Sequence, residues 1–448
     1  ILLPAFTPRK VQSASALVAL AALALAGALA LAQWDRPAAL IFAGVWAVDP
    51  MTVAAKLAIL VSAAAVVLLS PEWLRTDRRH GEYYGLLLFA VLGAVMMASA
   101  TDTMELVLGV LLSSAAGYPL AAYHRAWAPA LEAGMKFYLV AALANVLLAL
   151  GVVLLFGLTG ETGYRETAAA LDGADPLALG AAAVMVLVGL AFKMGAFPAH
   201  AWMPDVAQGS PAPSAAFLTV VPKIGAAVAL ARFVPLLPPE LGWRGVVAFM
   251  AVVTMTLGNL AALRQDDVRR LLGWSSVSQS GYALMAVVVV GAGGEALAAL
   301  LVFLAGYAAA NLAAFAVVVH WRGRTDLAGY RGIAALQPLP AMALILALLS
   351  LVGVPPLIGF FGKLLLFQVV IEGGYAWLAA AAAANTVVSL YYYLRVIAPM
   401  VLAAPEAPVH RLGPLSGAAA LALGALVLGL GLGVEALLAL APALALLP

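Results

Sequence analysis

The sequence contains no cysteine and few charged residues. Without cysteine the chain cannot form a disulfide, a thiolate-bound zinc site or an ordinary iron–sulfur cluster, so any electron transfer must take place in another chain. Charged residues make up 10% of the chain, whereas an ordinary soluble domain has about 25%. The net charge of +2 gives no reason to expect nucleic-acid binding.

Hydrophobic residues dominate instead, at 65% of the chain. At about 20 residues per crossing, the apolar runs predict an all-α polytopic membrane protein with about thirteen transmembrane helices. The expected segments are 13–32, 50–70, 82–100, 103–123, 132–157, 177–207, 211–237, 243–262, 268–291, 295–319, 338–372, 375–402 and 414–446.

The N-terminal segment does not resemble a cleavable signal. A short apolar stretch, Ile1 to Phe6, is followed by Pro8, Arg9 and Lys10 before the first full apolar run. We interpret this stretch as the end of a helix that would precede the sequence.

Basic residues predict the orientation in the membrane. The N-terminus and the loops after the even-numbered helices hold Arg9, Lys10, Arg75, Arg78, Arg79, Arg125, Arg264, Arg269, Arg270, Arg322, Arg324, Arg331 and Arg411, whereas the opposite side holds Arg36, Arg165, Arg244 and, by its position, Arg232. The positive-inside rule then places the N-terminus in the cytoplasm and the C-terminus across the membrane. We interpret the run from Arg264 to Arg270 as ordinary interfacial charge.

Two predicted spans are interrupted by proline and glycine. One carries prolines from Pro198 to Pro213, and the other carries Gly353, Pro355, Pro356 and Gly359. Because proline removes a backbone donor, both helices should open, near 198–210 and near 353–359. Opened backbone at membrane depth persists only where it lines a cavity or is packed in protein.

The two breaks occupy matching positions in two groups of five helices. Five crossings per group invert the second group relative to the first, and paired broken helices in inverted repeats indicate a transport site near the midplane. We therefore predict N-terminal peripheral helices in 1–81, a first repeat in 82–237, a second repeat in 243–402 and a C-terminal helix in 403–448.

Five of the six lysines lie in apolar stretches: Lys56, Lys136, Lys193, Lys223 and Lys363. A lysine at membrane depth costs roughly +2.5 to +3.5 kcal/mol unless it faces a polar interior. Lys193, Lys223 and Lys363 lie next to a break or in mid-span, so they are candidates for an ion path, the alternative being that they reach a headgroup region. An amine held away from water loses its proton more readily, as a proton-exchanging site requires. Lys56, near the start of its span, is expected to reach the headgroup region.

Two further positions are candidates. His200 lies in the first broken span, where an imidazole could bridge Lys193 and Lys223 or cap free carbonyls. Glu132 and Lys136 are four residues apart and can pair on one helix face, either in the ion path or as a solvated pair.

Several motifs resemble the antiporter-like membrane subunits of bacterial respiratory complex I, and among them the N type. They are Lys193 with Pro198-Ala199-His200-Ala201-Trp202-Met203-Pro204-Asp205-Val206, Gln208-Gly209-Ser210-Pro211-Ala212-Pro213 with Lys223, Arg270-Leu271-Leu272-Gly273-Trp274-Ser275-Ser276-Val277, Asp326-Leu327-Ala328-Gly329-Tyr330-Arg331-Gly332, Leu349 to Lys363, and Ser389-Leu390-Tyr391-Tyr392-Tyr393-Leu394-Arg395. The similarity covers about residues 45 to 400. It implies fourteen helices, one more than the thirteen expected here.

The resemblance implies proton translocation in an NADH:quinone oxidoreductase of the bacterial inner membrane. Lys193 would be the central lysine, Lys223 and His200 the connection between half-channels, Lys363 the terminal exchange site, and Lys136 with Glu132 a part of the entry side. It implies no cofactor in this chain, with NADH, FMN, iron–sulfur clusters and quinone in partner subunits. The partners would be neighbouring antiporter-like and small membrane subunits, with lipids around them.

Two positions depart from the family pattern. Leu111 stands where the family has a glutamate that partners the central lysine, and Gln279 where a histidine is common. The alternatives are therefore a subunit of a multisubunit Na⁺/H⁺ antiporter or membrane-bound hydrogenase, or a non-pumping structural member of complex I.

Overall fold

The computed structural model describes residues 12–75, 77, 80–291, 295–405, 410–439 and 444–447. Its helices are α2 (Ala14–Leu31), α3 (Pro50–Leu74), α4 (His80–Ser99), α5 (Thr103–Ala121), α6 (Ala128–Thr159), α7 (Tyr164–Ala170), α8 (Pro176–Met194), α9 (Trp202–Gly209), α10 (Ala212–Phe233), α11 (Trp243–Ala262), α12 (Val268–Val289), α13 (Ala296–His320), α14 (Ile333–Leu336), α15 (Pro338–Val352), α16 (Ile358–Glu372), α17 (Ala376–Leu402), α18 (Pro414–Leu432) and α19 (Val434–Leu438). Two short strands, β1 (Ala39–Ile41) and β2 (Trp46–Val48), pair antiparallel.

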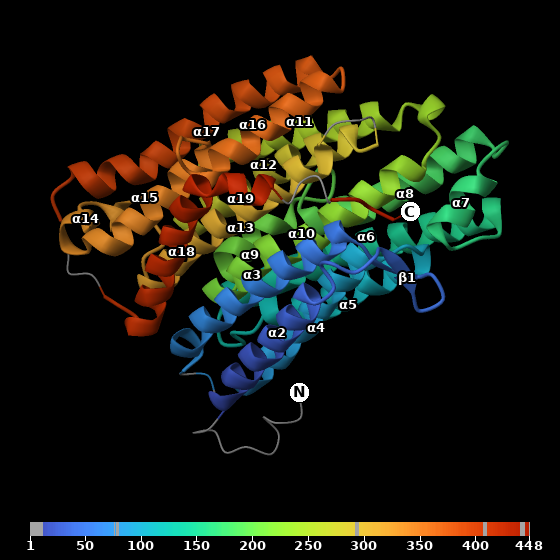
Figure 1. The fold of residues 1–448 in the computed structure, drawn as a ribbon. Helices are drawn as coiled ribbons and strands as arrows, with labels where there is room; N and C mark the ends of the chain where they lie inside the picture. Colours follow the sequence, from blue (N-terminus) through green and yellow to red (C-terminus); the bar gives the residue numbers. More distant parts are fainter. Residues whose placement is uncertain are drawn as a thin grey trace.

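The predicted membrane helices are confirmed as a helical bundle. Ten helices in the described part of the chain are long and apolar enough to cross a membrane. The other three predicted segments coincide with α12, with α17 and with the pair α15 and α16. Figure 1 shows the N-terminal half, α2 to α10, lying beside the C-terminal half, α11 to α19.

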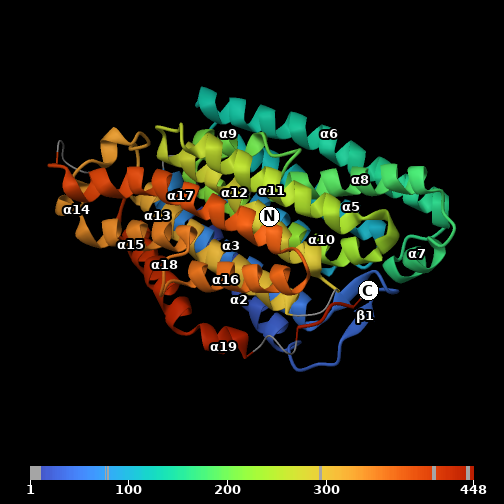
Figure 2. The same ribbon diagram turned by 90° about the horizontal axis from the view of Figure 1, so that it is seen from above.

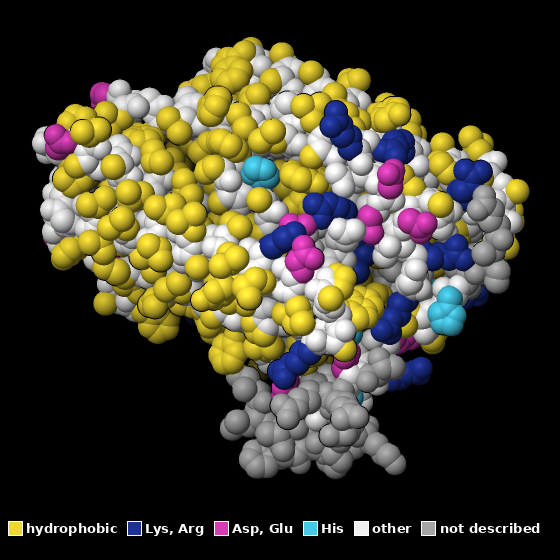
Figure 3. Space-filling model, turned by 180° about the vertical axis from the view of Figure 1, so that it is seen from behind, with side chains coloured by type: hydrophobic (Ala, Val, Ile, Leu, Met, Phe, Trp, Pro, Cys, Tyr) yellow, Lys and Arg dark blue, Asp and Glu magenta, His cyan; other side chains and the backbone are white. Residues whose placement is uncertain are grey.

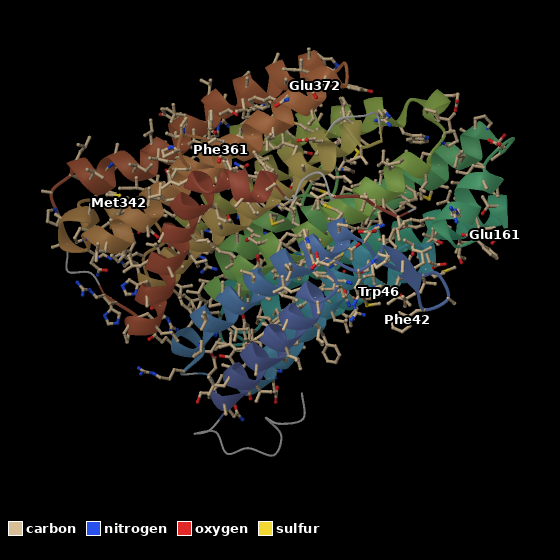
Figure 4. The ribbon with its side chains drawn as sticks, viewed as in Figure 1. Phe42, Trp46, Glu161, Met342, Phe361 and Glu372 are labelled. Carbon is tan, nitrogen blue, oxygen red and sulfur yellow. The ribbon has the colours of Figure 1, made fainter. Side chains whose placement is uncertain are left out.

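Three local features differ from the prediction. The last helix ends at Leu432 rather than continuing to 446, because Gly433 separates it from the short α19. The hairpin β1–β2 and the short helix α7 were not expected. Figure 4 shows that both lie toward one end of the bundle, where Phe42, Trp46 and Glu161 are labelled, while Met342 lies toward the other end.

Some predictions fall outside the described residues. These are the apolar stretch Ile1 to Phe6 and the basic residues Arg9, Lys10, Arg78 and Arg79.

Aspartate side chains begin four of the helices. Asp49, Asp102, Asp175 and Asp267 each accept a hydrogen bond from a backbone N–H in the first turn of α3, α5, α8 and α12. Such caps satisfy otherwise unpaired donors and contribute about 1 kcal/mol each. The sequence therefore marks these helix starts locally.

The centre of the bundle is formed by α10 and α13. Every residue of α10 is buried, as is almost all of α13. Figure 2 shows the same bundle from above, with α6 along one edge and α18 and α19 toward the opposite one. In Figure 3 the outer surface is largely hydrophobic, and most charged side chains on that face gather toward one side. A lysine on α10 is thus far from bulk water.

Both predicted helix breaks are present. In the first, α8 ends at Met194, Gly195 adopts a left-handed conformation with φ of 66°, and α9 begins at Trp202. In the second, α15 ends at Val352, Gly353 has φ of 100°, and α16 begins at Ile358. A cis peptide bond precedes Pro198 in one break and Pro356 in the other. Each broken helix is the fourth of its group of five, as the sequence predicts.

Candidate functional site

Lys223 lies at the centre of the bundle on α10 and is fully buried. Its ammonium group donates to the Ser276 carbonyl at 2.6 Å, to the Ser276 Oγ at 2.8 Å and to the Tyr307 hydroxyl at 3.3 Å. An ammonium group has three donors, so neutral oxygens can occupy all of them. The amine is therefore solvated by the protein without a carboxylate.

Hydroxyl and amide groups continue from Lys223 across to α13. The Tyr307 hydroxyl donates to the Thr219 carbonyl at 2.8 Å and lies 2.8 Å from the Ser276 Oγ. Asn311 donates to the Thr219 Oγ1 at 2.9 Å. These groups hold the lysine's neighbours in fixed positions, because each is itself hydrogen-bonded.

Lys363, on α16, binds the open end of α15. Its Nζ donates to the carbonyl oxygens of Leu351 at 3.0 Å and Val352 at 2.9 Å. These carbonyls lie in the last turn of α15, where the helix leaves acceptors unpaired and carries partial negative charge. The Gln279 amide also donates to Leu351 at 3.0 Å, and the Tyr282 ring centroid lies 4.2 Å from the Lys363 Nζ. The break thus supplies the polar environment of this lysine.

A small cavity lies between the partners of Lys223 and Lys363. Its volume is about 10 Å³, and Gln279, Phe303, Gly306, Tyr307, Ser350, Leu351, Gly359 and Lys363 line it. That volume is about the minimum that holds one water molecule. Because Tyr307 contacts Lys223, the cavity lies beside groups that contact both lysines.

Lys193 lies at the other break and differs from Lys363. It is buried in the last turn of α8, 5.4 Å from the Phe192 ring centroid, and no described residue gives it a hydrogen bond or an ion pair. Neutral groups take the carbonyls at this helix end: the Trp202 indole donates to Phe192 at 3.0 Å, and the Ser280 Oγ donates to Met194 at 2.5 Å. In the first break the carbonyls at the helix end are therefore bound by neutral donors, whereas in the second break they are bound by Lys363.

Ser280 connects the first break to the surroundings of Lys223. Besides Met194, its Oγ contacts the Ser276 carbonyl at 3.0 Å, and that carbonyl also accepts from Lys223. The sequence analysis did not identify Ser280. Its spacing of four residues from Ser276, which places both hydroxyls on one face of the helix, was the signal that could have identified it.

The predicted bridge by His200 is not formed among the described residues. Its ring centroid lies 6.3 Å from that of Phe197 and 5.9 Å from that of Trp274, and its Nδ1 is buried without a partner. His200 lies in the segment between α8 and α9. The turn of that segment directs the imidazole toward aromatic rings instead of the two lysines.

Glu132 and Lys136 form the expected pair, in an open cleft away from the buried lysines. Lys136 lies 2.7 Å from Glu132 and 3.3 Å from Asp205, and Arg270 lies 2.5 Å from Asp205. The cleft has a volume of about 590 Å³. The Lys136 side chain is 45% exposed, so water reaches this group directly.

The arginines between Arg264 and Arg270 are not all ordinary interfacial charge. Arg269 is buried and donates to the carbonyls of Ala207, at 2.9 Å, and Ser210. It therefore binds the carboxyl end of α9, beside the first break, and anchors that short helix to α12.

Lys56 is buried, contrary to the expectation that it reaches a headgroup region. Its Nζ lies 3.5 Å from the Gln33 Oε1 and 5.3 Å from the Trp46 ring centroid. The hairpin that carries Trp46 was not predicted, and it covers the lysine.

A buried ion pair at the same end was also missed. Arg232, at the end of α10, lies 2.5 Å from Asp49, and both side chains are fully buried. Arg232 also donates to Thr52 and to the carbonyls of Ala98 and Leu447. The sequence analysis placed Arg232 near the end of the helix predicted at 211–237 and counted it among the basic residues opposite the N-terminus, but it did not identify Asp49 as its partner.

Leu111 faces outward. It is 41% exposed on α5, whereas Val110 and Ser113 are buried on the inner face of the same helix. An acidic side chain at this position would point toward whatever packs against α5 and away from the interior of the chain.

Comparison with known proteins agrees with this architecture. Residues 100–389 match the family described as NADH:quinone oxidoreductase/Mrp antiporter, TM. NADH-quinone oxidoreductase subunit N of Mycobacterium sp. (strain JLS) is 47% identical over 371 residues, which are 83% of this chain and 79% of that protein. Subunit N 1 of Streptomyces griseus is 43% identical over 439 residues, or 97% and 92% of the two chains.

A solved structure supports the same assignment. A chain of respiratory complex I from Thermus thermophilus superposes with a TM-score of 0.83 at 34% identity, covering 96% of this chain and 94% of that one. The chain therefore belongs to the subunit N family of NADH-quinone oxidoreductase, among the antiporter-like membrane subunits of complex I.

Proposed function

We propose that the chain translocates protons across the bacterial inner membrane, along a route through Lys193, Lys223 and Lys363, and that quinone reduction in partner subunits drives it. The main support is one observation: three buried amines lie near the middle of the bundle, and no described carboxylate pairs with any of them. Unpaired buried lysines are costly at membrane depth and are rare outside ion pathways.

The surroundings of each lysine allow a proton to be handed on. Hydroxyl and carbonyl oxygens surround Lys223, and a cavity with room for about one water separates its partner Tyr307 from Lys363. Ser280 reaches from the carbonyl next to Lys193 to the carbonyl that binds Lys223. In this proposal Lys193 is the central site and Lys363 exchanges protons at the far end.

The cleft with Lys136, Glu132 and Asp205 is assigned to proton entry. It is open to water and lies next to α9, which follows the first break. Carboxylates at a water-filled mouth can collect protons and pass them inward.

The remaining chemistry belongs to partner subunits in this proposal. NADH, FMN, the iron–sulfur clusters and the quinone are assigned to other chains, and neighbouring antiporter-like and small subunits pack against the apolar outer surface. The exposed face of α5 that carries Leu111 is a candidate contact for such a neighbour.

A structural, non-pumping role is the second candidate, because Lys193 has no acidic partner among the described residues. Replacing Leu111 by glutamate separates the two. If the chain translocates protons and a neighbouring subunit contributes to its route at this face of α5, L111E changes the number of protons pumped per electron. If the chain has only a structural role, the number of protons pumped per electron stays the same.

The main test replaces Lys193, Lys223 or Lys363 by glutamine in the assembled complex. NADH oxidation and acidification of inverted membrane vesicles would be measured together. Each variant is expected to lose most of the proton pumping and to slow quinone reduction. Arg165→Gln, which removes an exposed positive charge on α7, is the matched control. Full pumping in all three lysine variants would refute the proposal.

A further inference from the structure

We propose that a groove between the first turns of α15 and α18 binds one phospholipid whose headgroup carries a net negative charge. In this proposal the phosphate lies against Arg411 and Gln337, and the acyl chains run along the outside of the two helices. The site concerns how the chain is held in the membrane, so it stands independently of the lysine route.

The groove lies where three helices of the bundle end or begin. It has a volume of about 660 Å³, and α13 contributes its last residue, His320. Pro338 and Pro414, which begin α15 and α18, also line it. Figure 1 shows α14, which leads into α15, at the end of the bundle opposite to β1. Ligand sites typically measure roughly 300–1,000 Å³, so the groove has room for a headgroup and its glycerol.

Gln337 lines this groove and carries an unpaired donor. It is 3% exposed, and the Trp321 indole donates to its Oε1 at 2.8 Å. Because an indole N–H can only donate, this bond fixes which end of the amide is oxygen. The Nε2 at the other end has no hydrogen-bond partner among the described residues. A buried donor without an acceptor is costly, and an oxygen of a bound molecule, directly or through one water, would satisfy it.

The charged side chains that line the groove are basic. Arg411 is exposed and forms no ion pair with a described residue. His320 also lines the groove, with its Nδ1 3.1 Å from the Ser416 Oγ. The nearby carboxylate of Glu72 is bound by the backbone N–H groups of Leu415 and Ser416, each at 2.9 Å, and is not among the lining residues. An arginine with neutral donors beside it suits the oxygens of a phosphate.

The groove continues as an apolar surface toward the membrane interior. Leu339 and Leu421 line it and are 64% and 37% exposed. Leu421 lies seven residues after Pro414, the first residue of α18, which is about 10 Å along the helix axis. A polar end joined to exposed leucines matches a phospholipid, whereas a free phosphate ion would contact the polar end alone.

The predicted orientation places this groove in a leaflet that contains anionic lipids. The distribution of basic residues predicts that Arg411 lies on the cytoplasmic side, together with Arg322 and Arg324 after α13. The cytoplasmic leaflet is negatively charged, and basic pockets between helices on that side bind lipid headgroups. The local charge therefore favours an anionic headgroup over a zwitterionic one.

A lipid in this groove joins α15 to α18. α15 is the first half of the second broken helix, and the carbonyls at its other end bind Lys363. The lipid thus restrains the broken helix at the end opposite to the break.

The test uses the whole complex in detergent with a phosphatidylglycerol that carries a photoreactive group on its acyl chain. After illumination, the label on this chain is mapped by mass spectrometry of its peptides. Label is expected in segments 336–340 and 413–421, and an excess of unlabelled phosphatidylglycerol should reduce it at least threefold. The same excess of phosphatidylcholine or of inorganic phosphate should leave it unchanged.

Variants connect the label to the named side chains. Arg411→Gln and Gln337→Leu should each lower the labelling at least threefold, whereas Arg411→Lys, which keeps the charge, should retain it. Arg165→Gln, which removes an exposed charge on α7, is the matched control and should be labelled as the wild type is. Ala418→Trp fills the groove from an exposed position and removes no polar group. It should also lose the label, and it keeps the test decisive if the other variants do not assemble.

Three results would overturn the site. The first is unchanged labelling in the assembled variants at Arg411, Gln337 and Ala418. The second is competition by phosphatidylcholine or by inorganic phosphate that equals competition by phosphatidylglycerol, because the site would then not select an anionic lipid. The third is an active complex without label in either segment, which would mean that another subunit covers the groove.

Discussion

Lys363 donates a hydrogen bond of 2.9 Å to the backbone carbonyl of Val352, the last residue of α15. A cation at this position lies at the partially negative end of a helix. At the other break the corresponding carbonyls are bound by neutral donors, and Lys193 has no partner among the described residues. The two broken helices therefore have a similar backbone, but their lysines differ in hydrogen bonding. Lys363 is held by backbone carbonyls, whereas Lys193 has no hydrogen bond among the described residues.

The second break should not tolerate a methyl group at Gly359. A Cβ added there would lie 1.8 Å from the Ser350 carbonyl oxygen, which is backbone and cannot rotate away. We expect Gly359→Ala to separate α15 from α16, to destabilise the fold by about 1–3 kcal/mol or more and to reduce pumping. The measurement is thermal inactivation of quinone reduction. Gly180→Ala is the control, since nothing lies near its Cβ; equal stability of the two variants would contradict this account.

Ser276 should be more important than its size suggests, because its Oγ contacts both Lys223 and Tyr307 at 2.8 Å. Hydrogen bonds to charged groups contribute about 1.5–3 kcal/mol, so Ser276→Ala should lower the pumping rate several-fold while the complex still assembles. Ser113→Ala is the control, because the Ser113 Oγ is buried without a partner. A Ser276→Ala complex that pumps at the wild-type rate would show that this contact is dispensable.

The Asp49–Arg232 pair should behave as a coupled unit in stability measurements. Removing one partner leaves an uncompensated buried charge and typically costs about 3–5 kcal/mol. We expect Asp49→Asn and Arg232→Met each to lower the thermal stability of the complex strongly, whereas the double variant should lose less than the sum. Additive losses would argue against direct coupling between the two side chains.

In the open cleft, Asp205 should matter more than Glu132. Asp205 contacts both Lys136 and Arg270 and is 19% exposed, whereas Glu132 contacts Lys136 and is 65% exposed. Exposed pairs contribute little and are screened by salt. Asp205→Asn should therefore slow turnover at low and at high ionic strength, and Glu132→Gln, its matched control, should have a small effect that salt removes. The reverse order of effects would contradict the geometry.

The helical architecture could be predicted because it follows from local signals. Apolar runs of the length of a bilayer predict spans, and prolines at matching places in two groups of five predict the breaks. Lys193, Lys223 and Lys363 could be identified for the same reason, since an amine in an apolar run needs a special environment wherever it lies.

The partners of those lysines could not be predicted, because they come from residues distant in the sequence. Ser276 contacts Lys223 from α12, and Tyr307 contacts it from α13. The partner of Arg232 could not be predicted because Asp49 lies 183 residues away. His200 lies in the expected segment and has a side chain that could exchange protons. The course of the chain between α8 and α9, however, turns its ring toward Trp274.

The narrow space between Tyr307 and Lys363 is lined by α12, α13, α15 and α16, all from the C-terminal half of the molecule. A room for about one water can be full or empty, with no intermediate filling. If the proposed route is correct, its step between Tyr307 and Lys363 takes place wholly among α12, α13, α15 and α16, and this step has room for no more than one small molecule at a time.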